Sequence, residues 1–459
     1  MYSIKEIFNR QKAYFLTEVS KTYEWRITQL ENMERMLSEN QAAFLEALKT
    51  DFKTCFSEQL FEVNAPLGII QFVKSQLVQW MQPVEVPIPK FLATSGHKGI
   101  IYREPYGSTL VIGPYNGPLI LLINPAIAAL SAGNTVVMKA NEQTPATSGL
   151  LESLIPQYFE PEVLALVNGG KEVSEELLSL PFDFIIFTGS SKTGKIVAKA
   201  AAEHLTPTIL ELGGQNPVII DQTANVADAA RKLVWAATGW GGQWCTSPGY
   251  VYIHESVADS FIEESKKALT EMYGDEIAAN PDFSKMISIS SVQRLVSLID
   301  AEKVVAGGSH DELNRFMEPT IIYPVKWNDP IMDEEIFGPI LPVLTYSELS
   351  DAVGNIKQKA KPLSAYIFSQ DQDTINLLAE TLSFGGGAVN QSNIHVFIVT
   401  LPFGGVGASG MGTYYGKPGF DALTHAKSIL HAPTVNSVDF LIPPYTIEKL
   451  QALNLWFDY

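Results

Sequence analysis

The chain has 459 residues, of which 46% are hydrophobic and 18% are charged, and its net charge is −18. This length exceeds what one hydrophobic core usually supports, so two or three domains are expected, and the composition excludes general disorder. The acidic balance argues against nucleic-acid binding, which needs a positively charged surface.

Two cysteines, Cys55 and Cys245, are too few for a disulfide framework. Neither lies in a CxxC or His/Cys cluster, so we expect no metal, and Cys55 is interpreted as a small buried hydrophobic residue. The N-terminus has no apolar signal core. The longest apolar stretch, 119–130, contains Asn124 and Pro125 and is too short to span a bilayer. We therefore expect a cytoplasmic enzyme that binds neither nucleic acid nor membrane.

The first 80 residues are predicted to be mostly helical. Their apolar positions recur at the spacing of one helix face, as in Ile27, Leu30, Leu37, Phe44 and Leu48. Three prolines in 83–89 exclude a helix interior and predict an extended connector there.

From about residue 100, short β-type runs alternate with helical patterns, which predicts βαβ units and two α/β domains in series with parallel sheets. The expected strands are 109–112, 135–139, 184–188, 208–212, 217–220, 250–253, 341–345, 364–368 and 387–390, with helices over 226–237 and 257–272. The tail from residue 435 is expected to be an extended arm followed by a short helix.

The strongest chemical feature is Cys245, which follows Gly241 and Gly242. Glycines allow backbone and substrate to come close to the sulfur, so this thiol is interpreted as a nucleophile. Glu211 ends an apolar strand, where burying a carboxylate is costly unless it has a task. Together the two residues predict covalent catalysis with a separate general base.

Several weaker motifs have a plain structural interpretation as well as a functional one. Gly189 and Ser190 stand between a strand and a helix, where backbone amides can bind a phosphate, although an ordinary turn is equally consistent. Lys139 and Glu142 follow another strand and can reach ribose hydroxyls, but alone they read as a polar loop. Asn116 can present its amide to an oxyanion, yet asparagine is common in turns.

A last motif contains Glu335 and Phe337. It can be interpreted as a solvated acidic cap beside a phenylalanine of the core, or as part of a binding site.

Taken together in order and spacing, these residues closely resemble the aldehyde dehydrogenase superfamily. The resemblance covers about residues 5–430 and is carried by Leu210-Glu211-Leu212-Gly213-Gly214, Gly242-Gln243-Trp244-Cys245, Glu335-Ile336-Phe337-Gly338-Pro339 and Pro402-Phe403-Gly404-Gly405-Val406-Gly407. The sequence that continues from this last motif through Tyr415-Gly416-Lys417 is similar to class 3 members of the superfamily. Among these, the chain most resembles bacterial benzaldehyde dehydrogenases.

The resemblance implies a chemistry. Cys245 would attack an aldehyde, Asn116 and the Cys245 backbone N–H would hold the oxyanion, and Glu211 would activate the water that hydrolyses the thioester. A nicotinamide cofactor would take the hydride. Its contacts would be Lys139 and Glu142 at the adenosine ribose, Gly189 and Ser190 at the pyrophosphate, Glu335 at the nicotinamide ribose and Phe337 near the nicotinamide. The carboxylate of Glu142 predicts that NAD is preferred, with NADP also accepted.

The resemblance also implies a fold. We expect two Rossmann-like α/β domains and a small β oligomerisation flap, in a homodimer. The expected division is a cofactor domain over 1–81 and 99–211, a catalytic domain over 212–404, a flap over 82–98 and 405–435, and a tail over 436–459.

The chain departs from the usual pattern around the substrate. Gly117 replaces an aromatic residue, Trp244 precedes the nucleophile where small residues are common, and Trp240 replaces an asparagine. We expect Gly117 to open one wall and Trp244 to supply a flat one, which favours an aromatic or bulky apolar aldehyde; the alternative is a Trp244 that points into the core. Tyr115 and His395 are also assigned to this pocket.

Three other functions compete with hydrolytic aldehyde oxidation. CoA-acylating relatives generally lack the base, so Glu211 argues against them. A cysteine hydrolase would need a histidine partner, and none of the seven histidines lies in a recognisable motif. A non-enzymatic structural role would not need Asn116, Glu211 and Cys245 together.

Overall fold

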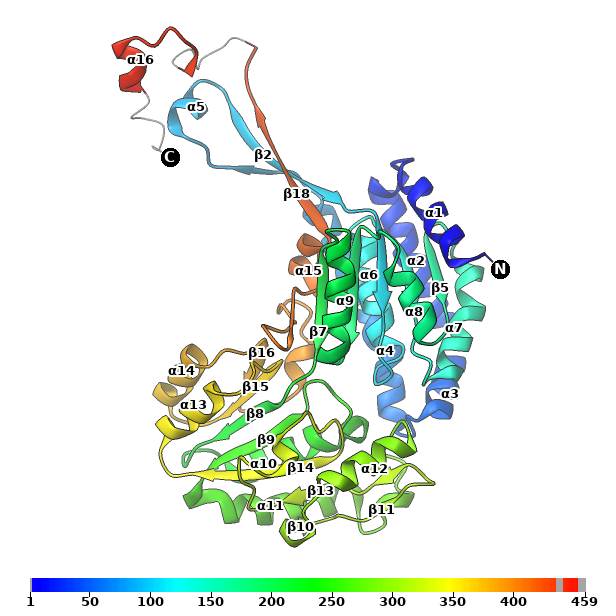
Figure 1. Cartoon of the computed structure of the whole chain (residues 1–459), viewed down its shortest axis with the longest axis vertical. Coiled ribbons are helices and arrows are strands. Elements are labelled where there is room, and N and C mark those ends of the chain that lie inside the picture. The colour runs from blue at the N-terminus through cyan, green and yellow to red at the C-terminus, as the bar shows by residue number, and fades with distance from the viewer. Residues whose placement is uncertain (1, 435–440, 453–459) are drawn as a thin grey trace.

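Two mainly parallel sheets, each covered by helices, form the body of the protein in the computed structural model, which describes residues 2–434 and 441–452 (Figure 1). In spatial order the first sheet contains β17 (Gly410–Met411), β7 (Thr208–Leu212), β6 (Phe184–Gly189), β3 (Ser108–Ile112), β4 (Thr135–Lys139) and β5 (Leu164–Val167). The second contains β10 (Val304–Ala306), β13 (Thr320–Ile322), β14 (Ile340–Tyr346), β9 (Pro248–His254), β8 (Asn216–Ile220), β15 (Ser364–Phe368) and β16 (Gly386–Val389). Only the pairs β17–β7 and β10–β13 are antiparallel in these two sheets.

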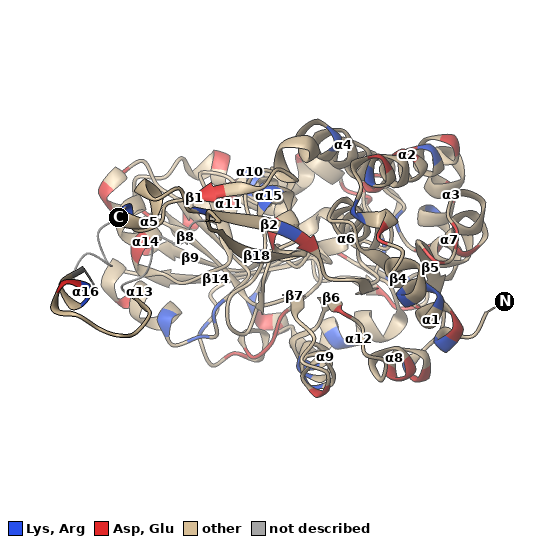
Figure 2. Cartoon of the chain, turned by 90° about the horizontal axis from the view of Figure 1, so that it is seen from above, with Lys and Arg blue, Asp and Glu red and all other residues tan. Residues whose placement is uncertain are grey.

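The predicted fold class is therefore confirmed, and both ends of every expected strand lie within two residues of those of an observed strand. Strands of a parallel sheet are covered on both faces, so they read as continuous apolar runs. The strands β8, β9 and β14 contain no Lys, Arg, Asp or Glu, and Figure 2 shows charges of both signs mixed on the outer helices. The four-residue strand β5 was not predicted.

Helices α1 (Ile4–Phe15), α2 (Tyr23–Glu39), α3 (Gln41–Asp51), α4 (Phe56–Trp80), α6 (Ile120–Ser131), α7 (Pro145–Tyr158), α8 (Lys171–Leu178) and α9 (Ser191–Glu203) accompany the first sheet. Helices α10 (Val226–Thr238), α11 (Glu255–Tyr273), α12 (Ile289–Leu298), α13 (Leu349–Lys357) and α14 (Gln372–Thr381) accompany the second. The apolar stripe from Ile27 to Leu48 belongs to two helices, because the chain breaks at Asn40 between α2 and α3. No helix in the described ranges is long and apolar enough to cross a membrane.

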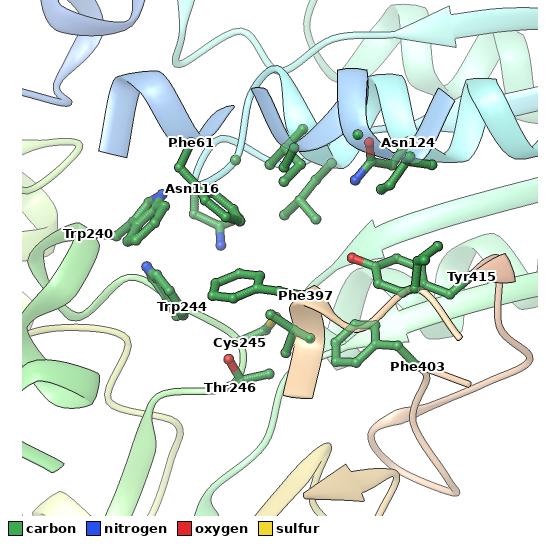
Figure 3. Close-up of a pocket in the computed structure, with 18 residues that line it drawn as sticks. Phe61, Asn116, Asn124, Trp240, Trp244, Cys245, Thr246, Phe397, Phe403 and Tyr415 are labelled. Carbon is green, nitrogen blue, oxygen red and sulfur yellow. The ribbon is translucent and has the colours of Figure 1, made fainter. Parts of the chain in front are cut away.

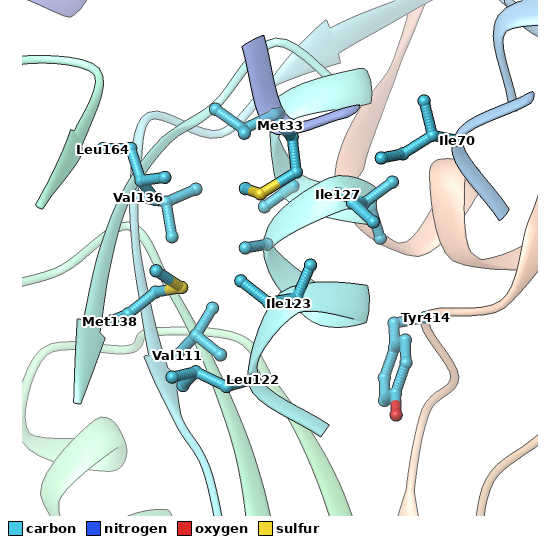
Figure 4. Close-up of a cluster of buried hydrophobic side chains, with 14 of the residues drawn as sticks. Met33, Ile70, Val111, Leu122, Ile123, Ile127, Val136, Met138, Leu164 and Tyr414 are labelled. Carbon is cyan, nitrogen blue, oxygen red and sulfur yellow. The ribbon is translucent and has the colours of Figure 1, made fainter. Parts of the chain in front are cut away.

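Helix α6 lies at the centre of the first core. Its residues Ile123 and Ile127 pack among Met33 of α2, Val111 of β3 and Met138 of β4, all almost fully buried (Figure 4). This packing fixes the N-terminal end of α6, which carries part of the site described below.

A three-stranded antiparallel sheet of β1 (Val84–Val86), β2 (Lys98–Pro105) and β18 (Thr424–His431) extends from the body as an arm (Figure 1). Short helix α5 (Lys90–Thr94) lies between β1 and β2, and α15 (Gly416–Ala422) precedes β18. The arm draws on both segments of the expected flap, but β2 runs past the expected boundary at 98. Another difference is β17, which pairs with β7 of the first sheet instead of joining the flap.

The described part of the tail contains α16 (Ile447–Ala452), in agreement with the expected short helix. The expectation of an extended arm over 435–440 lies outside the described residues. Cys55 is buried at the N-terminus of α4, as predicted.

Candidate active site

Cys245 lies on a loop whose shape depends on three consecutive left-handed residues, Trp240, Gly241 and Gly242, with φ values of 54°, 63° and 70°. A β-carbon at Gly242 would lie 2.1 Å from the backbone carbonyl carbon of Gly338. Only glycine fits this close crossing of two chain segments. The glycines that suggested a nucleophile in the sequence therefore serve to bend the loop.

Asn216, at the start of β8, ties this loop to the second sheet. Its Nδ2 donates to the carbonyl oxygens of Cys245 and Ser247, at 2.8 Å each, and its Oδ1 accepts from the backbone N–H of Ser364 on β15 at 2.8 Å. No role was predicted for Asn216 from the sequence.

Buried charged groups hold the loop from the other side. Glu58 of α4 accepts a hydrogen bond from the Trp240 backbone N–H at 2.6 Å. One turn further, Glu62 pairs with the fully buried Lys53 at 3.1 Å and accepts from the Ile120 N–H at 2.8 Å. These groups join α4, the N-terminal turn of α6 and the cysteine loop, and none of them was predicted.

Asn116 and Cys245 line the same cavity. Asn116 follows β3, is buried, and donates from Nδ2 to the carbonyl oxygen of Gln243 at 2.9 Å. This bond orients the amide, and the second hydrogen on the same nitrogen is left for another acceptor. The oxyanion role of Asn116 stays a prediction.

Glu211 is buried in β7, and neither carboxylate oxygen has a hydrogen-bond partner among the described residues. Burial raises the pKa of this carboxyl well above its usual value. The 402–412 loop covers it, because β17 pairs Gly410 opposite Glu211 and a β-carbon at Gly404 would lie 3.2 Å from Glu211 Oε1. A carboxyl kept buried and unpartnered in this way is a candidate proton acceptor.

The Cys245 side chain is half-buried on the wall of a cavity and lies within electrostatic reach of two acids. Burial raises its pKa to about 12, and Glu335 and Glu211 both add to the rise. The structure therefore brings together the three predicted catalytic residues, with Glu335 as a fourth group around the sulfur.

Glu335 lies against the backbone of Gly213, where a β-carbon would be only 2.1 Å from Oε2. Burial raises its pKa to about 7, which the hydrogen bond from the Gly214 backbone and the charge of Arg294 partly oppose. Its Oε1 has no partner among the described residues, as expected of an acceptor kept for a ribose hydroxyl. Phe337, with a positive φ of 49°, presents its ring to Tyr115, at 5.9 Å between centroids.

The remaining cofactor residues lie at the ends of β4 and β6. Lys139 is buried and its Nζ is 2.7 Å from Glu142 Oε2. Ser190 caps α9 by accepting from the Thr193 N–H at 3.2 Å, and a β-carbon at Gly189 would meet the ring of Phe187 at 2.6 Å. The carboxyl ends of parallel strands, beside the N-terminus of a helix such as α9, are a common place for a dinucleotide to bind.

An apolar cavity of about 380 Å³ leads to the Cys245 side chain (Figure 3). One end is an aromatic cluster in which the Trp244 ring lies 4.0 Å from that of Trp240 and 5.9 Å from that of Phe397. Gly117, just before α6, also lines the cavity, and a β-carbon there would come within 2.8 Å of the Leu121 side chain. The other lining residues are Phe61, Ala65, Gly68, Ile69, Ile120, Asn124, Thr246, Val396, Val399, Phe403 and Tyr415.

Trp244, Trp240 and Gly117 thus lie where the sequence placed them, and Trp244 faces the cavity. Two assignments differ. Tyr115 does not line this cavity, because its ring packs edge-on against Phe52 and Phe337. His395 does not line it either; it is buried beside Ser364, whose Oγ is 3.2 Å from Nε2, and burial lowers its pKa to about 4.

Comparison with known proteins gives one consistent result. Residues 4–429 match the aldehyde dehydrogenase family. The chain is 40% identical over 448 residues to 4,4'-diaponeurosporen-aldehyde dehydrogenase of Staphylococcus aureus, covering 97% of each chain. It is 37% identical to the mouse dimeric NADP-preferring aldehyde dehydrogenase, covering 94% of this chain and 95% of that one. A substrate-bound structure of Staphylococcus aureus AldH superposes with a TM-score of 0.96 over the full length of both chains, at 39% identity.

Proposed function

Because the chain belongs to the aldehyde dehydrogenase family, and is thus an oxidoreductase that uses a nicotinamide cofactor, we propose that Cys245, Glu211 and Asn116 oxidise an apolar aldehyde to its carboxylate. The observation that carries the proposal is a thiol that lines an apolar cavity, within electrostatic reach of a buried carboxyl that has no hydrogen-bond partner among the described residues.

The first half of the reaction makes a thioester. The Cys245 sulfur, as thiolate, bonds to the aldehyde carbon, and the carbonyl oxygen becomes an oxyanion that the free Asn116 amide hydrogen stabilises. The nicotinamide supplies the hydride acceptor when it is bound. Loss of hydride from the carbon restores the C=O bond and leaves an acyl group on sulfur.

The second half consumes water. Glu211 takes a proton from a water molecule, whose oxygen attacks the thioester carbon, and the C–S bond breaks to return the thiolate and release the acid. A raised pKa suits Glu211 to this task, since a base works best when its pKa lies near the working pH. The competing cysteine hydrolase is not favoured, because the charged groups that act most strongly on the thiol are Glu335 and Glu211.

The roles are tested by Glu211→Gln. With a saturating aldehyde, this variant should release one equivalent of NADH or NADPH per site in a burst, and its steady-state rate should fall by about 10² to 10⁴. Cys245→Ala should give neither burst nor turnover. A Glu211→Gln variant that keeps the wild-type steady-state rate, or that gives no burst because it fails before the thioester forms, would refute the assignment of Glu211.

The cofactor preference depends on Lys139 and Glu142. The expectation that NAD is preferred is not supported by the comparisons, in which the mouse relative is named NADP-preferring. Although partial burial opposes ionisation of Glu142, its bond to Lys139 lowers its pKa, so the pair is a carboxylate beside an ammonium group. We propose that both cofactors are accepted, and the ratio of kcat/KM for NADP and NAD measures the preference.

Assembly and location are also proposals. The strand β18 is an exposed edge of the arm, which we propose to be covered by a second copy of the chain in a homodimer. The cytoplasmic location stays a prediction from the sequence.

A further inference from the structure

The end of the substrate cavity away from the tryptophan cluster contains polar groups that the proposed mechanism does not use. Asn124 on α6 is 2% exposed and lines the cavity, yet neither its Nδ2 nor its Oδ1 has a hydrogen-bond partner among the described residues. Burying an amide without hydrogen-bond partners costs free energy. We therefore expect Asn124 to form hydrogen bonds with a bound molecule when one occupies the cavity.

Tyr415 lies at the same end of the cavity (Figure 3). Burial raises the pKa of this phenol, and the nearby side chains of Tyr414 and Asn124 oppose part of the rise. The two side chains are thus close enough to interact, but they do not satisfy each other with a well-formed hydrogen bond. An amide and a hydroxyl remain available to one bound group, and in Figure 3 Cys245 lies between them and the tryptophans.

The cavity also ends here. Behind Asn124 and Tyr415 is a separate cavity of about 10 Å³, lined by Tyr414 and Phe420 as well, which is enough for about one water molecule. A substrate chain that reaches Asn124 therefore stops there.

Resting on the proposed function, we infer that Asn124 and Tyr415 form a polar subsite that binds an uncharged hydroxyl or similar hydrogen-bonding group at the far end of an otherwise apolar aldehyde. An amide and a phenol can each donate and accept, which matches a hydroxyl. A charged group does not fit, because the residues that line the cavity include no Lys, Arg, Asp or Glu and an unpaired charge is costly there.

The test compares straight-chain alkanals with ω-hydroxyalkanals of the same length, from about six to about twelve carbons, using kcat/KM at saturating cofactor. At the chain length that spans the cavity, the wild-type enzyme should prefer the hydroxyalkanal by about tenfold, the effect of one good hydrogen bond. In Asn124→Leu, which keeps the side-chain size, this ratio should fall to about one. Tyr415→Phe should also reduce the ratio of kcat/KM for the hydroxyalkanal to that for the alkanal. The two variants are independent, so one of them can still decide the test if the other does not fold.

Ile69→Val is the matched control, because Ile69 lines both cavities without a polar atom. It should change kcat/KM for both members of a pair by a similar factor and leave their ratio unchanged. A wild-type ratio near one at every length, as expected if Asn124 and Tyr415 only bind water, would overturn the inference. So would a ratio that survives in both Asn124→Leu and Tyr415→Phe. Neither result touches the proposed function, which fails only if no aldehyde yields NADH or NADPH.

Discussion

The charge state of Cys245 depends on its burial and on two acids, Glu335 and Glu211. At pH 8 Glu335, with a pKa of about 7, is ionised and disfavours the thiolate. Glu335→Gln should therefore lower the pKa of the thiol and accelerate alkylation of Cys245 by iodoacetamide, by up to about tenfold for each pKa unit gained. Mass spectrometry of the Cys245 peptide measures the rate. Glu334→Gln, which changes an exposed neighbouring carboxylate, should leave it unchanged, and equal rates in all three proteins would contradict the electrostatic link.

The raised pKa of Glu211 predicts a pH-dependent cost to stability. In the unfolded chain a glutamate titrates near about 4.3, whereas burial holds the folded pKa well above that. Between the two values the folded state binds the proton more tightly, so its stability falls as the pH rises through this window. Glu211→Gln cannot ionise, and its Tm relative to wild type should therefore increase from pH 5 to pH 8. Two Tm curves that stay parallel would show that burial does not shift this carboxyl.

At the residue scale, the sequence identified the groups whose chemistry is unusual for their surroundings. Cys245 after two glycines and Glu211 in an apolar strand stand out in this way, and the family resemblance added their roles. Asn216 and Asn124 could not be assigned, because their importance comes from contacts with distant segments or from the lack of such contacts. Tyr115 was assigned to the substrate pocket, but its ring packs against Phe52 and Phe337 instead.

Asn216, on β8, makes two hydrogen bonds to the cysteine loop and one to β15, each of 2.8 Å. Asn216→Ala leaves these backbone groups without that partner, which should cost about 1 to 3 kcal/mol of stability and displace the nucleophile. We expect kcat to fall by about ten- to hundredfold. Asn225→Ala is the control, since it removes only the N-terminal cap of α10 and should destabilise by about 1 kcal/mol with kcat retained. Thermal unfolding and steady-state kinetics of the two variants separate positioning from stability.

Whole elements were predictable where one local signal dominates. Buried parallel strands such as β14 are apolar runs that need no knowledge of their neighbours. Strand β5 has only four residues, Leu164–Val167, and follows α7 after a short turn, so length and periodicity do not separate it from the surrounding helical pattern. The break at Asn40 was also hidden, because α2 and α3 continue one apolar stripe across it.

At the scale of the whole molecule, the α/β architecture follows from alternating patterns, whereas the arm was expected only through the family resemblance. Its strands come from segments more than 300 residues apart, since β2 pairs Lys98 with His431 of β18. The composition of neither segment predicts that it pairs with the other. Pairing at this separation is a property of the folded chain.

The arm should mediate dimer formation. From His425 to His431 every residue of β18 is exposed, and this edge strand includes Leu430 at 56% exposure. An unpaired apolar edge invites pairing with another chain unless it is covered. Light scattering of the wild-type protein should therefore give about twice the chain mass of 50.4 kDa. Leu430→Glu should shift the mass toward one chain, whereas Leu313→Glu, at a residue 86% exposed outside the arm, should leave a dimer. A wild-type monomer would contradict dimer formation itself. A Leu430→Glu protein that stays as dimeric as the control at low micromolar concentration would show that the dimer contact lies outside this edge of the arm.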